Sequence, residues 1–303
     1  MESNETKELL QAMEERRNSR RRAMMLGGAA LAGLALTSKP AFAAAAVTDA
    51  DILNFALNLE FLEAQYYTLA TTGTTIDVAA GISTKGGSGA AGGTVTVKAN
   101  PMVTFTDTST QDFALEIALD EQNHVKFLQS NLGSAAVAMP NIDLLNSFNA
   151  LAAAAGLGSS FDPFANQTNF LLGAFIFEDV GVTAYQGAAG LITDKTYLDK
   201  AVGIHNVEAY HAAGIRTRIF QAGSLAQSAS QAIATTRAKL DGTNNDDIGV
   251  SVTNNAATIV DAPDVHAQTY ARTTSQVLAV VYGGGAAGTG GAFFPNGLNG
   301  TIR

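Results

Sequence analysis

Two short motifs with the same spacing constrain this chain more than any other feature of its sequence. Each is a Glu followed three residues later by a His, in Glu121 to His124 and again in Glu208 to His211. In an α-helix this spacing places both side chains on the same face, about one turn apart. A carboxylate and an imidazole on one helix face make half of a metal site. Two such helices therefore predict a bundle whose interior holds two metal ions.

Two further glutamates complete the pattern. Glu60 and Glu178 each lie inside an apolar helical run, ahead of Glu121 and Glu208 respectively. The first interval is 61 residues and the second is 30. The excess is close to the length of a stretch rich in Gly and Thr, residues 71–108, which is therefore interpreted as an insertion into one of two related helix hairpins. An internal repeat of this kind predicts two half-sites that meet about a pseudo-twofold axis.

Glutamate and histidine are scarce in the rest of the chain. After residue 43 there are six glutamates and four histidines, and six of these ten residues belong to the motif. Glu178 also follows the apolar run 170–177, where an uncompensated carboxylate is costly or is forced to protonate. The alternative interpretation is a set of surface carboxylates with neighbouring histidines. Four buried carboxylates instead favour neutralisation by cations.

Apolar periodicity predicts an all-α chain built on a four-helix bundle. The four long helices are expected at about 48–69, 109–132, 166–192 and 194–220. A short helix is expected within 143–155, and an extra C-terminal helix from Pro263 to Tyr282. The insertion 71–108 is too rich in Gly and Thr for a helix, and a small β-hairpin is expected near 93–106. The tail with Phe293 and Phe294 is expected to lie over the bundle or a partner.

The N-terminus has the order of an export signal. Three arginines, Arg20 to Arg22, precede an apolar run of 14 residues, and Ala41-Phe42-Ala43 has the small-x-small pattern of a signal-peptidase site. Paired arginines ahead of a Gly/Ala-rich core are typical of a twin-arginine signal. The run is shorter than the roughly 20 residues of a membrane-spanning helix. A basic tail or an uncleaved anchor is the alternative.

These boundaries predict a signal peptide at 1–43, a bundle at 44–222, and a C-terminal extension with one helix and a Gly-rich tail at 223–303. The location is then periplasmic or extracellular, with the twin-arginine export machinery as a partner and no stable membrane span after cleavage. Residues 44–303 carry 11 Lys and Arg against 22 Asp and Glu, a net charge of −11. This balance disfavours nucleic acid and anionic membranes as partners. The chain has no Cys, which fits a cargo that folds, and loads its metal, before transport.

The residues also resemble a known family. Asn54 to Tyr67, Asp120 to His124 and Arg272 to Leu278 are similar to segments of the ferritin-like superfamily, and most closely of its desiccation-related, often exported branch. The resemblance implies a centre of two iron or two manganese ions. By this resemblance, Glu60 and Glu178 would be terminal or bridging carboxylates, and Glu121 and Glu208 would be bridging carboxylates. His124 and His211 would each bind one metal. Asp120 would support a ligand His.

Four residues near the motif have open roles. Glu63 and His205 break the symmetry of the two halves, because their counterparts are Gly181 and Ala118. Either residue could be an extra ligand or a proton relay. The alternative interpretations are a solvated Glu at the bundle mouth for Glu63 and a capping or core His for His205. Tyr67 and Tyr185 each follow a lone Glu by seven residues. They are interpreted as packing residues with hydroxyls near the site, or as catalytic radical or electron relays.

The donor set suits iron, manganese or zinc and does not choose among them. Two redox metals about 3.5–4 Å apart share two-electron chemistry on an oxygen species. The sequence therefore predicts an exported dimetal oxidoreductase, acting in oxidative or desiccation stress, that reduces or dismutates peroxide or oxidises ferrous iron. Its small-molecule partner would be peroxide or dioxygen. The alternatives are a non-catalytic metal-binding or protective protein and an iron store, with a homo-oligomer left open.

Overall fold

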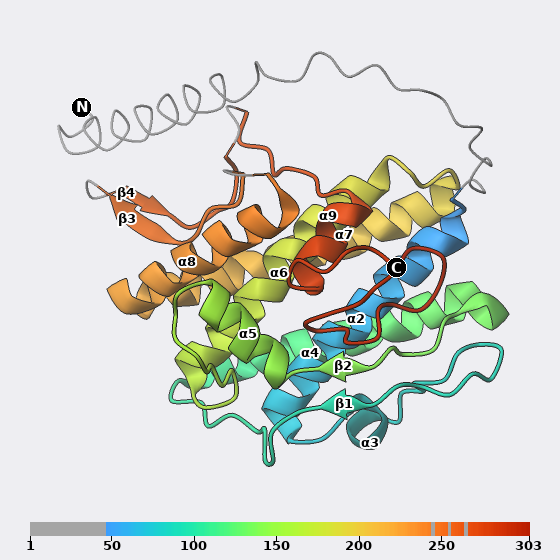
Figure 1. Ribbon diagram of the computed structural model, residues 1–303, viewed down its shortest axis with the longest axis horizontal. Helices are drawn as coiled ribbons and strands as arrows, with labels where there is room; N and C mark the ends of the chain where they lie inside the picture. The colour runs from blue at the N-terminus through green and yellow to red at the C-terminus, as the bar shows by residue number, and fades with distance from the viewer. Residues whose placement is uncertain (1–46, 244–245, 254–255, 264–265) are drawn as a thin grey trace.

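Four long helices form the frame of the molecule (Figure 1). They are α2 (Asp49–Thr72), α4 (Thr108–Leu132), α6 (Gln167–Ala189) and α7 (Lys195–Gln221). Helix α2 packs along α4, and α6 packs along α7, so that two hairpins face each other. The predicted all-α four-helix bundle is confirmed, with the Gly/Thr-rich insertion between its first two helices.

The computed structural model describes residues 47–303 apart from 244–245, 254–255 and 264–265. The expected export signal at 1–43 lies outside these residues. Within the described part of the chain, no helix has the length and apolar character needed to cross a membrane.

Side-chain caps set where the four long helices begin. Thr48 accepts a hydrogen bond from the backbone N–H of Asp51, and the Asp51 carboxylate accepts one from the backbone of Thr48, a reciprocal capping box. Asp107, Asn166 and Asp194 cap α4, α6 and α7 through their side-chain oxygens. These caps fix the register of each helix, and therefore the level at which its Glu and His side chains enter the bundle.

The expected hairpin near 93–106 is wrong. Strand β1 (Val95–Thr96) instead pairs in parallel with β2 (Ile142–Asp143), which precedes α5 (Asn146–Ala154). A five-residue helix, α3 (Ile76–Ala80), also interrupts the insertion. Glycine in the insertion lets its backbone approach the segment after α4 closely. A Cβ atom at Gly93 would lie only 2.5 Å from the Asn141 backbone nitrogen. The insertion is thereby held against the segment that follows α4 and its 3₁₀ turn (Gly133–Ala135).

The C-terminal extension contains two helices where one was expected. Helix α8 (Ser224–Asp241) was missed because most of its buried face consists of Ala, Ser and Thr rather than large apolar residues. Strands β3 (Ser251–Thr253) and β4 (Ala256–Thr258) form an antiparallel pair beside it (Figure 1). Helix α9 (Thr274–Val281) begins later than expected from Pro263, because Thr273 and Gln276 form its capping box.

The C-terminal tail was expected to lie over the bundle or over a partner, and it lies over the bundle. Phe293 and Phe294 are fully buried. The Phe293 ring packs edge-on against Phe148 of α5 and Phe177 of α6, with ring centroids 5.1 and 4.9 Å apart. This aromatic contact joins the extension to the helix that carries Glu178.

Candidate metal centre

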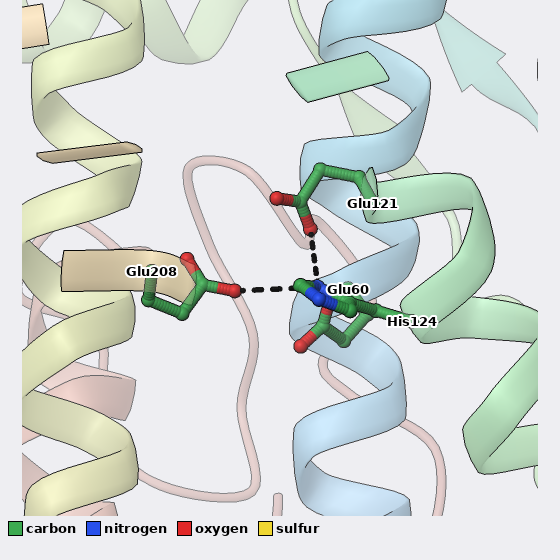
Figure 2. Close-up of side chains that lie close together, drawn as sticks. All are labelled: Glu60, Glu121, His124 and Glu208. Carbon is green, nitrogen blue, oxygen red and sulfur yellow. Dashed lines mark hydrogen bonds and ion pairs between the residues drawn. The ribbon is translucent and has the colours of Figure 1, made fainter. Parts of the chain in front are cut away.

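Six side chains from four helices converge in the middle of the bundle. They are Glu60 on α2, Glu121 and His124 on α4, Glu178 on α6, and Glu208 and His211 on α7. Figure 2 shows four of them, with the carboxylates of Glu121 and Glu208 pointing at the His124 ring beside Glu60. The four glutamates are between 0 and 1% exposed. Carboxylates this deeply buried need neutralisation.

The six residues form two overlapping groups. Within each group, one potential ligand atom from every residue lies within 4.8 Å of the others. The first group contains Glu60 and His124, the second contains Glu178 and His211, and both contain Glu121 and Glu208. The structure thus brings together all six sequence-predicted ligands, and the shared carboxylates lie where they would bridge two cations.

His124 presents Nδ1 to three carboxylates. This nitrogen lies 3.2 Å from Glu60 Oε2, 3.2 Å from Glu121 Oε2 and 3.5 Å from Glu208 Oε1. The His124 side chain is 11% exposed. No carboxylate supports the far side of this ring from α7, where the counterpart of Asp120 is the apolar Val207.

His211 uses its two ring nitrogens differently. Its Nδ1 lies 3.0 Å from Glu121 Oε1 and 3.5 Å from Glu178 Oε2. Its Nε2 is 3.1 Å from Asp120 Oδ2, on α4. A proton on Nε2 donated to Asp120 leaves Nδ1 with a lone pair that faces the carboxylates, the arrangement a metal ligand requires.

Several buried polar atoms at the centre have no hydrogen-bond partner among the described residues. They are Glu121 Oε1, Glu178 Oε2, both carboxylate oxygens of Glu208 and Nδ1 of His211. These atoms approach one another closely without hydrogen-bond geometry, as ligands around a shared cation do. Unsatisfied buried groups are rare in native proteins and call for a cause. Two cations would satisfy them, so the residues present fit a dimetal centre.

Without cations the carboxylates cannot all remain ionised. Burial raises the pKa of Glu60 to about 7, against the opposing charge of His124. Burial and the neighbouring Glu121 raise the pKa of Glu208 well above its ordinary value. Burial opposes ionisation of Glu121 too, but the two imidazoles outweigh it and lower its pKa. Two histidines therefore compensate part of the negative charge and leave the remainder uncompensated.

The pKa values of the two histidines reflect the same excess of negative charge. Burial alone would lower the pKa of His211, but Glu178 and Glu121 outweigh it and raise that pKa to about 12. The pKa of His124 is raised too, by Glu60 and Glu121 against the effect of burial. In the metal-free protein both rings carry the positive charge that metal ions would otherwise supply.

The two tyrosines cross between the hairpins. Tyr67 on α2 donates its hydroxyl to Glu178 on α6, and Tyr185 on α6 donates to Glu60 Oε1 on α2 at 2.5 Å. Burial, followed by the nearby carboxylates, raises the pKa of both phenols well above the ordinary value. Both therefore remain hydrogen-bond donors that orient the two outer carboxylates.

Glu63 and His205 have different surroundings. Glu63 is 5% exposed, so its interpretation as a solvated Glu at the bundle mouth is wrong. Burial and the charge of Glu208 raise the pKa of Glu63 well above its ordinary value. His205 is half-buried and belongs to neither ligand group. It lines a separate cavity with Asp179 and Arg216.

Sequence reasoning missed the buried network that begins beside Glu178. Asp179 Oδ2 accepts hydrogen bonds from Arg216 at 2.8 Å and Arg237 at 2.9 Å. Arg237 also binds both oxygens of Asp247, and Arg272 donates to Asp247 Oδ2 at 2.7 Å. We call these five residues the arginine–aspartate network. The acidic pair Glu178-Asp179 inside the most apolar helix was the one feature of the sequence that indicated this network.

Comparisons with known proteins agree with this geometry. The model of the ferritin-like domain family matches residues 48–221. A ferritin-like catalase, Nec2, from Nesocodon mauritianus is 27% identical over 270 residues, which cover 84% of each chain. The desiccation-related protein PCC13-62 from Craterostigma plantagineum is 31% identical over 180 residues, or 57% of this chain and 54% of the relative. No solved structure gives a significant match.

Proposed function

The chain belongs to the ferritin-like domain family, and on that premise we propose that it is a dimetal oxidoreductase that consumes hydrogen peroxide. The observation that carries the proposal is the pair of buried ligand groups that share Glu121 and Glu208. Four carboxylates balance the charge of two divalent cations, and each group contains one histidine. Bound iron or manganese ions would supply two-electron redox chemistry at this site.

The chain's own residues would hold and orient this centre. Asp120 fixes the tautomer of His211 by accepting from Nε2. Tyr67 and Tyr185 hold the carboxylates of Glu178 and Glu60 from the opposite hairpin. Burial of all four glutamates excludes bulk water from the centre.

Disproportionation of peroxide is the reaction that the comparisons favour. The relative that aligns over most of both chains is named a ferritin-like catalase. In such a reaction one peroxide is oxidised to dioxygen, and its two electrons and two protons reduce a second peroxide to two waters. The same balance needs no other oxidant or reductant.

The experiment is peroxide consumption by purified protein of known metal content. We expect two equivalents of iron or manganese per chain and release of dioxygen from peroxide. Glu178→Ala should lose metal and activity, whereas Glu116→Ala, at an exposed position on α4, should keep both. Less than half an equivalent of redox metal, together with unchanged peroxide consumption in Glu178→Ala, would refute the proposal and leave a non-catalytic protective role.

We also propose that the protein is exported and acts in oxidative or desiccation stress. The support is the arginine-rich segment with its apolar run at the N-terminus and the similarity to a relative named as desiccation-related. N-terminal sequencing of the protein from its producing cells tests the export. A mature chain that begins after Ala43 is expected, and one that begins before Ala23 would contradict cleavage.

A further inference from the structure

A narrow apolar cavity lies between α2 and α6, on the side of the bundle that α9 and the tail cover. Its walls are aliphatic and aromatic side chains, among them Leu59, Ile176, Val180 and Phe293. Within this lining the only ionisable groups are the carboxyl of Glu63 and the phenol of Tyr185. Tyr185 also binds the ligand-group residue Glu60. The cavity wall therefore includes a residue that is hydrogen-bonded to a member of the ligand groups.

Gly181 lines this cavity and lies against a residue of the ligand groups. A Cβ atom at this position would lie 3.0 Å from Glu208 Oε2 and 3.5 Å from Glu63 Oε1. Glu208 Oε2 is one of the buried oxygens without a hydrogen-bond partner, and Glu208 belongs to both ligand groups. Gly181 therefore belongs to the cavity wall and also lies beside the shared carboxylate of Glu208.

The apolar walls select by chemistry. A molecule that needs hydrogen bonds, such as water, peroxide or a hydrated ion, would lose about 1–3 kcal/mol for each bond left unmade in such surroundings. A small molecule without hydrogen-bonding groups loses nothing comparable, and dry apolar cavities bind such molecules, xenon among them. Dioxygen is the reactant or product of dimetal chemistry that has this property.

We propose that the cavity between α2 and α6 is the dioxygen path of the centre. This inference rests on the proposed function, in which dioxygen is formed at the site. In this proposal, polar molecules approach from the α4–α7 side, where the side chain of Asp120 is 39% exposed and that of His124 is 11% exposed. The two seams of the bundle thus serve different molecules.

The first test locates an apolar gas without relying on catalysis. Crystals of the full-length protein under xenon pressure should show a xenon atom between α2 and α6, near Gly181. Ala184→Leu adds bulk to the cavity wall and should remove that atom, whereas Ala189→Leu, on the same helix but outside the lining, should keep it. Absence of xenon from the parent cavity would overturn the proposal, even if the metal centre and its activity are intact.

The second test follows the reduced metal centre as it is oxidised. Ala184→Leu should slow oxidation by dioxygen by at least about tenfold, with oxidation by peroxide and metal content unchanged. Ala188→Leu, at a half-buried part of the lining, repeats the test if the first variant does not fold. An equal loss with both oxidants, or no loss with either, would contradict a separate dioxygen path. Lack of metal in the parent protein would instead refute the proposed function and leave the xenon result standing.

Discussion

Two buried acidic clusters meet at adjacent residues of α6 and are neutralised in different ways. Glu178 faces the metal centre, where its Oε2 has no hydrogen-bond partner among the described residues. Asp179 faces the arginine–aspartate network, where it receives hydrogen bonds from Arg216 and Arg237. Both carboxylates are at most 4% exposed. Their difference lies in their partners and not in their burial.

This difference shows that proximity of acids does not by itself indicate a metal. Asp179, Asp247 and Asp261 also bring ligand atoms within 4.8 Å of one another. Arginine side chains donate hydrogen bonds to Asp179 and Asp247. The pKa of Asp261 is raised well above its ordinary value by burial and by both neighbouring aspartates. Burial therefore favours the protonated, neutral form of Asp261. Both oxygens of Asp261 also have no hydrogen-bond partner among the described residues. The two imidazoles and the shared carboxylates Glu121 and Glu208 are what distinguish the candidate metal centre.

Breaking the arginine–aspartate network should have the largest effect on stability. Arg237→Met leaves Asp179 and Asp247 buried with fewer partners, and loss of one member of a buried ion pair costs about 3–5 kcal/mol. Chemical denaturation measures this loss against Lys239→Met, an exposed position on α8. Equal stability of the two variants would contradict a structural role for the network. The folded fraction of Arg237→Met should bind metal as the parent does.

The pH dependence of the metal-free protein should separate the two clusters. Glu60 has a folded pKa raised to about 7 from 4.5, so its contribution to stability is present below pH 4.5 and is lost as pH rises through 7. This loss amounts to about 3 kcal/mol. Asp247 has a folded pKa below 3.8, so its contribution is present above pH 3.8 and is lost as pH falls through the folded pKa.

Denaturation of the metal-free protein from pH 3 to pH 8 checks both limbs. Stability should be greatest in mildly acidic solution and should fall in both directions. Added metal should restore stability at the alkaline end, because metal ions displace protons from the ligands. A metal-free protein that gains stability between pH 5 and pH 8 would show that the centre is neutralised by its own side chains.

Removal of the support behind His211 should have a smaller effect, confined to the metal centre. Asp120→Asn weakens the hold on the ring and should reduce metal affinity by about 10–100-fold. Isothermal titration of metal into the metal-free protein measures this change, with Asp112→Asn at an exposed position of α4 as the control. Affinity within twofold of the parent would show that Asp120 does not position the ligand.

Substitution of the tyrosines should have the smallest effect on metal binding. Tyr67→Phe removes a hydrogen bond to Glu178 and should weaken metal binding by on the order of 1 kcal/mol. Its neighbour Tyr66 instead donates to the Phe170 carbonyl at 2.8 Å, so Tyr66→Phe should lower the free energy of unfolding without changing metal affinity. Identical metal affinities in the two variants would remove Tyr67 from the centre.

The cluster of six candidate ligands could be predicted from sequence because helical spacing fixes which side chains share a face. The Glu-x-x-His motifs and the two lone glutamates need only the four helices and their repeat. Burial of Glu63 is different in kind, because it depends on Gly181 of another helix lying opposite. Local spacing contains no such information.

The parts that could not be predicted depend on contacts between distant segments. The arginine–aspartate network draws on α6, α7, α8 and two later loop residues, with no periodicity of its own. Strand β1 pairs with residues beyond the whole of α4, so its own sequence indicates an extended segment but not its partner. Helix α8 buries mainly small side chains, which weakens the apolar pattern that marks helices.

Metal content with crystallographic location tests the central claim most directly. Natively purified protein should contain two iron or manganese ions per chain by elemental analysis. Anomalous diffraction should place both between Glu60, Glu121, His124, Glu178, Glu208 and His211, with none at Asp179, Asp247 and Asp261. Protein that folds and stays active without redox metal, or that binds its metal among the arginines, would contradict the account.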